Sequence, residues 1–523
     1  MSTSPKLDIV YLLQETQMLW GGVMNVFREA EALQARGHRC LILSPTELGE
    51  CYRGFDVTFR KVETLTPQAV PKVDLIVATY YPTIPIAWKA DRLGLGRACH
   101  YCQGYEGDSS DLFDSLPFIE RNYSLPGILH LSINDFLAKR CEALFGWKAH
   151  VIPYGIGPDF FPAVPPTENN RPVRIGLVGP WEVEWKDLPT GLKGVQQAQE
   201  RGLEVTLVRM SPIPISEDER KAWGNLQVEA HEELSPENMG VLYRGLDLFV
   251  GSSRGGGEGF FLPALEAMAS GVPCLLSDIP CFHSYAEPSD YALFFPAGDP
   301  NALGEGILRL SRDLEMQRKL RNRGLATARL YSYDRHIQAL EAALLEVASQ
   351  PSGIQAQQCR DWDLSEQALL LEERGDPAQA LTLLTEALEG HPSSYPLWES
   401  LGRILGRMNR LEEASQALAR ALDLKPSSPS TWGALGFCQS KLGMLDKGIA
   451  SYQRAIDLGL PGPRPLLDLA LIHMGRGDTQ KAIQALREAQ DKMPRHGPQG
   501  EARKRIATEI AYLSALGKPE CAC

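Results

Sequence analysis

Apolar positions in the first part of the chain alternate between short strand-like runs and stretches with helical spacing. LDIVYLLQ (7–14) is a buried-strand run, VMNVFREAEALQARG (23–37) is apolar at helical spacing and ends at a glycine, and HRCLILSP (38–45) is a second strand run. Strand, helix and strand in this order form a βαβ unit with a parallel sheet. Because similar runs continue along the chain, residues 1–165 are predicted to form a doubly wound domain.

The same alternation starts again after a stretch rich in proline and polar residues, FPAVPPTENNRP (161–172), which is typical of a linker. The runs VRIGLVG, LEVTLVRM, DLFVGSS and CLLSDI are strand-like, with helical spacing between the first two. We therefore expect a second doubly wound domain over 173–330. An amphipathic helix over 331–349 closes it.

Beyond residue 360 the strand pattern ends and a period of 34 residues appears. Trp398 and Trp432 are 34 apart, as are Pro392 and Pro426. We expect four repeats of a helix pair over 362–496 and a cap helix over 497–517. The polar stretch 349–361 is interpreted as a hinge, so a chain that ends near residue 350 is expected to fold without the repeats.

Composition narrows the class of protein. The 523 residues carry a net charge of -12, which leaves no broad basic surface for nucleic acid. No run of 18 apolar residues is present, and the eleven cysteines lack a disulfide spacing, so we expect a cytoplasmic protein with reduced thiols. Cys99 and Cys102 form a CxxC pair, but in a strand they point to opposite faces and do not form a metal or redox site.

The stretch SSRGGGEGFFLPALEAMASGVP (252–273) combines a glycine-rich loop with a short predicted helix that begins near Pro263 and ends near Gly271. Amides at the start of a helix at the carboxyl edge of a parallel sheet suit a diphosphate. The predicted amide donors are Phe260, Phe261 and Leu262. Glu258 and Glu266 suit hydroxyl groups on either side of that anion, as in a nucleotide sugar. The alternative is a solvated loop glutamate and one that complements the helix dipole.

EGFFLPALEAMASGVP resembles the E-x7-E signature of retaining glycosyltransferases of the GT-B fold, specifically family 4. The resemblance extends to the glycine loop at Gly21 and Gly22, to VIPYGIGPDFF (151–161), to the GDP turn at Gly298, and to Lys186 at the position of the family's diphosphate-binding lysine. The repeats resemble the tetratricopeptide repeat at its pattern of Trp, Leu-Gly, Ala and Pro, at Trp398, Leu401, Gly402, Ala414, Ala421 and Pro426.

The resemblance implies an α/β GT-B fold, two Rossmann-like domains facing a cleft, followed by an all-α tetratricopeptide solenoid. It implies that the nucleotide sugar binds mainly to the second domain and the acceptor to the first, that no metal or other cofactor is needed, and that 331–349 crosses back onto the first domain. If the family's residue roles apply to the matching positions here, Glu266 binds the ribose, Glu258 the transferred sugar and Lys186 the diphosphate. Gly21, Gly22 and Gly259 would then allow the backbone to approach the donor closely.

Two positions depart from the family pattern. The arginine that usually precedes the lysine by six residues is replaced by Pro180, and Arg254 or Arg209 is the candidate substitute, although each is also an ordinary surface or sheet-end arginine. Many members have a histidine where this chain has Gln103, whose amide can still bond a sugar hydroxyl. His100 beside it is expected to be a strand residue rather than a catalytic base.

The leading hypothesis is a retaining, metal-independent glycosyltransferase of hexosyl or related groups, acting on a glycan, lipid-linked or protein acceptor in bacterial surface-glycan synthesis or protein glycosylation. The repeats are expected to bind a protein or peptide partner, and FLAKRCEALFGWK (136–148) is a candidate for peripheral contact with the inner face of the membrane. A degenerate GT-B scaffold acting through its repeats is the alternative. A phosphorylase or epimerase is a third, although no pyridoxal phosphate lysine site is recognisable.

Overall fold

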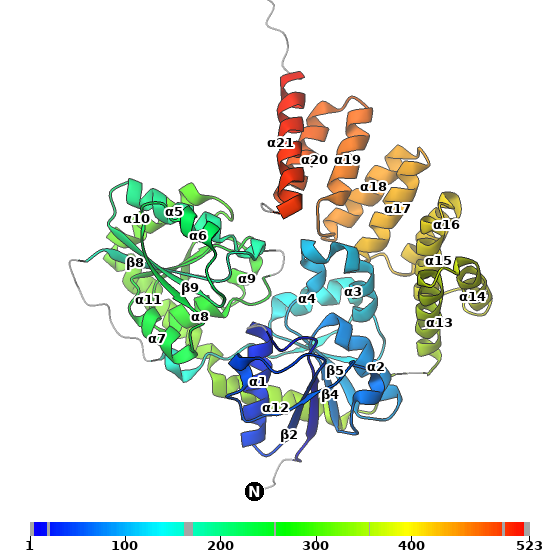
Figure 1. Ribbon diagram of the computed structural model, residues 1–523, viewed down its shortest axis with the longest axis horizontal. Helices are drawn as coiled ribbons and strands as arrows, with labels where there is room; N and C mark the ends of the chain where they lie inside the picture. The colour runs from blue at the N-terminus through cyan, green and yellow to red at the C-terminus, as the bar shows by residue number, and fades with distance from the viewer. Residues whose placement is uncertain are drawn as a thin grey trace, which may run out of the picture. The chain divides into compact units, whose positions relative to one another are not determined.

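The first sheet is parallel throughout and has the strand order β3-β2-β1-β4-β5-β6-β7. The computed structural model describes residues 5–17, 21–161, 171–255, 258–354, 356–493 and 497–516 (Figure 1). The strands are β1 (Asp8–Leu12), β2 (Arg39–Ser44), β3 (Thr58–Lys61), β4 (Leu75–Ala78), β5 (Arg97–Cys102), β6 (Leu129–Ser132) and β7 (Ala149–Val151). The connecting helices are α1 (Gly21–Ala35), α2 (Ile84–Arg92), α3 (Leu116–Tyr123) and α4 (Asp135–Phe145).

The second sheet is also parallel, with the order β10-β9-β8-β11-β12-β13. Its strands are β8 (Val173–Val178), β9 (Val205–Ser211), β10 (Gln227–Glu232), β11 (Leu248–Gly251), β12 (Cys274–Ser277) and β13 (Ala292–Phe295). Its helices are α5 (Leu188–Glu200), α6 (Glu217–Ala222), α7 (Pro236–Arg244), α8 (Leu262–Ala269), α9 (Pro280–His283), α10 (Pro300–Arg312) and α11 (Leu314–Ala328). Apolar clusters cover both faces: Leu207 belongs to one and Val208 to the other, which explains the continuous apolar runs in the sequence.

Helix α12 (Tyr333–Ser349) follows the second sheet but packs on α1, β4 and β5 of the first. Tyr333 donates its backbone N–H to the Ile156 carbonyl oxygen at 3.1 Å. His336 contacts the Pro153 carbonyl oxygen at 2.8 Å and Glu29 Oε1 at 2.9 Å. The chain therefore returns to the first sheet, as the resemblance implied.

Nine helices follow among the described residues, eight of which form four antiparallel pairs. They are α13 (Ala356–Glu373), α14 (Pro377–Gly390), α15 (Tyr395–Arg407), α16 (Leu411–Leu424), α17 (Pro429–Lys441), α18 (Leu445–Asp457), α19 (Arg464–Gly475) and α20 (Thr479–Asp491), with α21 (Gly497–Leu516) after them. The small residues in phase with the period are buried because neighbouring helices approach there: a Cβ at Gly448 would lie 2.3 Å from Ser440 Oγ. The predicted fold class, two Rossmann-like sheets followed by a helical repeat region, is confirmed.

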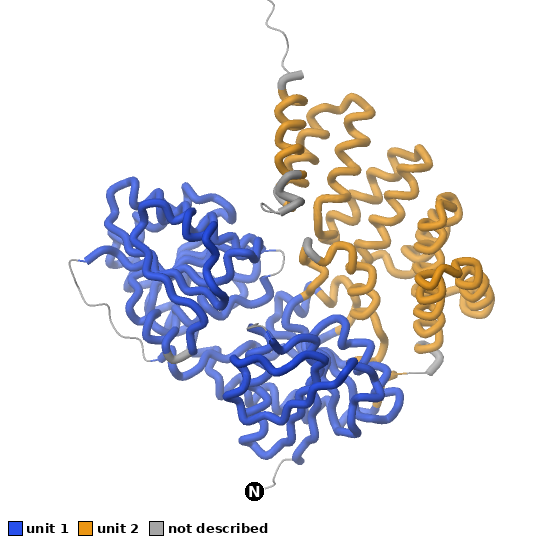
Figure 2. The backbone as a smooth tube through the Cα atoms, viewed as in Figure 1, with its two compact units in different colours: residues 1–104, 129–140, 148–351 blue, residues 105–128, 141–147, 352–523 orange. Residues whose placement is uncertain are grey.

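The chain forms two compact units (Figure 2). One boundary lies between 351 and 352, close to the predicted end of the first part near residue 350, but the sequence did not predict that two earlier segments belong to the second unit. The first holds 1–104, 129–140 and 148–351; the second holds 105–128, 141–147 and 352–523. A segment of the predicted first domain, including α3, therefore belongs with the repeats. Of the stretch 349–361 interpreted as a hinge, the part from Ala356 onward is helical, because α12 runs to Ser349 and α13 begins at Ala356.

The candidate membrane segment 136–148 lies mainly on α4. Its apolar positions Leu137, Cys141 and Leu144 are each at most 2% exposed, so these three side chains are covered by protein. Within the described ranges, no helix combines the length and apolar character that crossing a bilayer requires. The predicted linker at 161–172 falls largely on residues outside those described.

Candidate functional site

The predicted donor site lies at the carboxyl edge of the second sheet, where the strand order reverses between β8 and β11. Ligands of doubly wound sheets bind at such a reversal, because the loops that follow the two strands diverge there. Lys186 ends a short 3-10 helix in the loop after β8, and Glu258 lies in the loop after β11. Gly256 and Gly257 of the second loop lie outside the described residues.

Lys186 and Glu258, which the sequence assigned to different parts of the donor, form an ion pair with 2.6 Å between Nζ and Oε2. Ser253 Oγ donates to the same carboxylate oxygen at 2.9 Å, and the Glu258 side chain is only 4% exposed. The Lys186 ammonium also lies 4.5 Å from the centroid of the Phe261 ring. Since the charges cancel in this state, an incoming diphosphate must compete with Glu258 for the lysine.

Glu266 lies on α8, which has Pro263 in its first turn and is followed by Gly271 at φ 76°. The helix therefore begins and ends close to the two residues from which the sequence predicted its ends. The Tyr243 hydroxyl donates to Glu266 Oε2 at 3.3 Å. Burial raises the pKa of the Glu266 carboxyl to about 7, against the opposing effects of Arg28 and the Tyr243 hydrogen bond. The group therefore changes charge near neutral pH.

We expect donor binding to strengthen as pH rises through 7, because ribose hydroxyls donate hydrogen bonds to the ionised form of Glu266. For a nucleotide diphosphate sugar, whose diphosphate has no proton to lose in this range, the affinity should rise about tenfold between pH 6 and pH 8 for a carboxyl with a pKa near 7. Calorimetric titration at both pH values measures this. Glu266→Gln should bind weakly at both; an equally steep pH profile in that variant would assign the effect to another group.

The start of α8 is fixed by aromatic side chains. The Tyr285 hydroxyl donates to the Phe261 carbonyl oxygen at 2.9 Å, and Phe261 is the N-cap residue of the helix. The Phe260 ring lies 5.7 Å, centroid to centroid, from Tyr154 and 5.6 Å from Tyr285. The predicted amide segment from Phe260 to Leu262 is therefore held at the helix start, where the dipole favours an anion.

Several first-domain residues lie against this loop. A Cβ on Gly22 would lie 2.6 Å from Gln103 Oε1, and the Tyr154 hydroxyl donates to that same oxygen. A Cβ on Gly259 would lie 3.0 Å from the Gln103 carbonyl oxygen. The structure thus brings Gly22, Gln103 and Gly259 together, whereas a Cβ on Gly21 would meet nothing within 4 Å.

Sequence reasoning missed Asn134, whose Nδ2 donates to the Gly259 carbonyl oxygen while its Oδ1 accepts the Leu137 backbone N–H at 2.7 Å. An asparagine between a strand run and a helix is a readable N-cap signal, but its bond to the donor loop is tertiary. Tyr154 was missed as well, because its hydrogen bond to Gln103 joins residues 51 apart in sequence. Tyr243 has no local signal.

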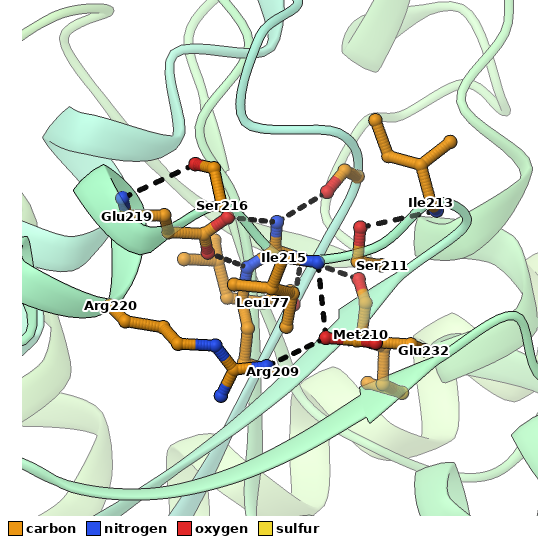
Figure 3. Close-up of polar contacts among 11 residues, drawn as sticks. Leu177, Arg209, Met210, Ser211, Ile213, Ile215, Ser216, Glu219, Arg220 and Glu232 are labelled. Carbon is orange, nitrogen blue, oxygen red and sulfur yellow. Dashed lines mark hydrogen bonds and ion pairs between the residues drawn. The ribbon is translucent and has the colours of Figure 1, made fainter.

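Neither candidate arginine lies free beside Lys186. Arg209 is 1% exposed and pairs with Glu219, with 2.5 Å between Nε and Oε1 (Figure 3). Its guanidinium also donates to the carbonyl oxygens of Met210 at 2.5 Å and Gly179 at 2.6 Å. Arg254 pairs with Asp187 through Nε. Arg209 is therefore a buried support for the strand end that leads into the lysine loop.

We expect Arg209→Met to lower the free energy of unfolding by about 3–5 kcal/mol, because it leaves the Glu219 carboxylate buried without its cation. Chemical denaturation measures the change. Arg220→Met is the matched control: it lies on α6 beside Glu219, and its ion pair with Glu232 is partly exposed and is expected to contribute under about 1 kcal/mol. A double variant, Arg209→Met with Glu219→Leu, should recover much of the loss; equal destabilisation by both arginine variants would contradict the assignment.

His100 is a buried strand residue, as expected. Its Nδ1 lies 3.3 Å from His130 Nδ1, and burial lowers the pKa of His100 to about 3. Cys99 and Cys102 both lie in β5 and are buried, and burial raises the pKa of the Cys99 thiol to about 12. Among the described residues no group of three or more His, Cys, Asp or Glu side chains is placed to hold a metal ion.

Two Rossmann-like sheets with the candidate donor groups at a carboxyl edge define a GT-B fold. Residues 172–313 match the family model described as glycosyl transferases group 1, and residues 371–436 and 440–498 match tetratricopeptide repeat models. The chain therefore carries a group 1 glycosyltransferase domain, which supports glycosyltransferase activity, and tetratricopeptide repeats. No curated protein sequence matches the chain.

Solved structures agree on the fold. A glycosyltransferase from Rickettsia africae is similar with a TM-score of 0.54 at 12% identity, covering 66% of this chain and 100% of its own. Anabaena HepE, solved in complex with UDP and glucose, is similar with a TM-score of 0.54 at 14% identity, covering 65% of this chain and 99% of its own. At these identities the likeness shows the GT-B fold alone.

Proposed function

We propose that the chain is a retaining, metal-independent glycosyltransferase of family 4 that moves a hexosyl or related group from a nucleotide diphosphate sugar to an acceptor hydroxyl. The observation that carries this proposal is the ion pair of Lys186 and Glu258, with 2.6 Å between Nζ and Oε2. Glu258 lies in the loop that precedes α8, and α8 carries Glu266. We therefore assign Lys186, in the loop after β8, to the diphosphate, Glu258, in the loop after β11, to the transferred sugar, and Glu266, on α8, to the ribose.

In the proposed reaction the diphosphate takes over Lys186 and the amides at the start of α8, which releases Glu258 to accept hydrogen bonds from the transferred sugar. The sugar–phosphate bond then breaks through an oxocarbenium-like state, the acceptor oxygen attacks from the same face, and the departing phosphate oxygen takes the acceptor proton. Glu258 stabilises the positive charge that develops on the sugar. No side-chain nucleophile is required.

We propose that no metal is needed, because Lys186 and the amides at the start of α8 supply the positive charge that a metal ion would supply to the diphosphate. Pro180 removes the family's second cation, and Arg209 does not replace it because its guanidinium is used by Glu219. Arg254 remains the candidate if binding of the donor draws it from Asp187.

The proposed acceptor is a hydroxyl of a glycan, a lipid-linked saccharide or a protein in bacterial surface-glycan synthesis or protein glycosylation, with the reaction in the cytoplasm. The repeats suggest a protein partner, and the donor base is proposed to be uracil, because the similar HepE structure contains UDP.

The alternative, a GT-B scaffold without activity, is favoured by one observation, the missing arginine at Pro180. Incubating the full chain with UDP-, GDP- and ADP-sugars separates the two proposals. The transferase should show thermal stabilisation and slow hydrolysis with one of them, since a ligand at 100 times its Kd stabilises by about 2.7 kcal/mol. Stabilisation without any turnover would favour the scaffold, and a product anomer opposite to that of the donor would exclude retention.

A further inference from the structure

The first helices of the four repeat pairs form one face of the second unit (Figure 2). These helices, α13, α15, α17 and α19, lie side by side along the array. Ser365 Oγ of α13 lies 2.6 Å from Ser400 Oγ of α15, and the Arg403 guanidinium of α15 donates to Ser430 Oγ of α17 at 2.8 Å. Repeat arrays bind their partners on extended faces of this kind. Helix α3, which belongs to the same unit, lies on this face.

The carboxylate of Glu120, on α3, is bound at the start of α17. Glu120 is 2% exposed and accepts hydrogen bonds from Ser430 N at 3.0 Å and Ser430 Oγ at 2.9 Å. Ser428, the N-cap residue of α17, donates through its hydroxyl as well. Burial raises the pKa of the Glu120 carboxyl, against the opposing effects of Ser428 and Lys425. The helix dipole, two serines and a lysine thus form a binding site for one carboxylate.

The next residue of α3, Arg121, is bound by α13. Its guanidinium donates to Ser365 Oγ at 2.8 Å and to the Trp362 carbonyl oxygen at 2.7 Å. The guanidinium carbon also lies 5.8 Å from the centroid of the Trp362 ring, within the range of a cation–π contact. Two neighbouring side chains of opposite charge therefore reach two different first helices of the repeats.

Apolar side chains of the same segment complete the contact. Leu116 is 1% exposed and belongs to a cluster with Leu460, and Phe113 and Trp432 pack against that cluster. Leu116 and Glu120 are four residues apart on α3 and so share one side of the helix. The side chains bound by the repeats follow the pattern Phe-x2-Leu-x3-Glu-Arg along the segment.

We propose that this face of the repeats is a peptide-binding site whose ligand is the chain's own segment 112–125. The site recognises a helix by two apolar side chains and an adjacent pair of opposite charges, each of which has its own partners on the repeats. A tethered ligand competes at an effective concentration of about 1 mM. A partner protein that uses this face therefore has to displace α3, and it has to carry the same combination of side chains.

A labelled peptide with the sequence LFDSLPFIERNYSL (112–125) tests this proposal on the full chain. The wild-type chain should bind it weakly, because its own segment fills the site. Glu120→Lys places a cation beside Lys425 and should release α3, so the peptide should bind that variant at least tenfold more tightly in fluorescence polarisation. Asp114→Lys, an equal change of charge at an exposed position of the same segment, is the matched control and should bind the peptide as the wild type does. The experiment uses no sugar donor, so its result does not depend on the proposed function.

A second peptide tests whether the charged pair is recognised. With the changes Glu120→Gln and Arg121→Met in the peptide, its affinity for the Glu120→Lys chain should fall at least tenfold. Equal affinity of the two peptides, or a Glu120→Lys chain that binds no more tightly than the wild type, would overturn the proposal.

If the Glu120→Lys chain does not fold, Arg121→Met in the chain replaces it. That change removes the guanidinium contacts with α13 and leaves the Glu120 carboxylate in place. It should raise the affinity for the unchanged peptide at least threefold over that of the wild type. An unchanged affinity in this variant would equally overturn the proposal, because the bonds of Arg121 would then contribute nothing to holding α3 on the repeats.

Discussion

Glu258→Gln is expected to lower sugar transfer about a thousandfold while nucleoside diphosphate binding is kept or tightened. The loss follows because the amide cannot offer a negative charge to the positive charge that develops on the sugar, and removal of one such electrostatic partner costs about 10²–10³ in rate. The tighter binding follows because Lys186 then has no carboxylate to leave before it meets the diphosphate. The measurements are kcat with the best donor and the Kd of UDP.

Glu200→Gln, an exposed change on α5, is the matched control and should alter neither quantity. Lys186→Met should act in the opposite way to Glu258→Gln, weakening UDP at once because the diphosphate loses its nearest cation. A Glu258→Gln enzyme that transfers sugar at the wild-type rate would remove this glutamate from the site. A large loss of UDP affinity would instead mean that the Glu258 carboxylate holds the loop rather than the sugar.

Much of the second domain was predictable because its signals are local. The strand runs are apolar on both faces, as expected where helices cover both sides of a parallel sheet, and Pro263 and Gly271 mark the two ends of α8. Seven residues lie between Glu258 and Glu266, which was enough to predict that the first lies on the loop and the second in the helix. Each of these features can be predicted from a short stretch of sequence.

The contacts of the charged groups were not predictable, because each depends on where distant loops meet. Nothing near Arg209 indicates that Glu219 neutralises it, and the bond between Arg254 and Asp187 joins loops 67 residues apart in sequence. Sequence reasoning offered both arginines as replacements for the missing cation. Whether an arginine is available to a ligand depends on its burial and on its ion-pair partner, and neither can be recognised from the residues next to it in the sequence.

The place of α3 was missed for a related reason. Helical periodicity shows which face of a helix is buried but not what covers it. Glu120 interrupts the buried face of α3, and a buried carboxylate is a signal that a partner exists, but that partner is Ser430, 310 residues later. The 34-residue period likewise predicted the repeats without indicating that their helix starts bind an earlier part of the chain.

A chain ending at residue 350 is therefore expected to yield less soluble, monomeric protein than the full chain, contrary to what the sequence alone suggested. Without the repeats, Leu116 loses its packing against Ala455 and Leu460, and exposing such a side chain costs about 1.5–3 kcal/mol. Glu120 loses Ser428 and Ser430 as well. Against a typical total of about 5–15 kcal/mol, these losses are large for one helix.

The measurement is size-exclusion chromatography and thermal melting of residues 1–350 beside the full chain. A chain ending at residue 516 is the control, because it keeps every described helix and should behave as the full chain does. Replacing Leu116 by Gln and Phe113 by Ser in the truncated chain removes apolar side chains that pack with the repeat residues and should recover part of the soluble protein, since exposed apolar surface is the expected cause of its aggregation. A monomeric 1–350 chain with an unchanged melting temperature would show that the first domain folds without the repeats, and that α3 has its own support on the first sheet.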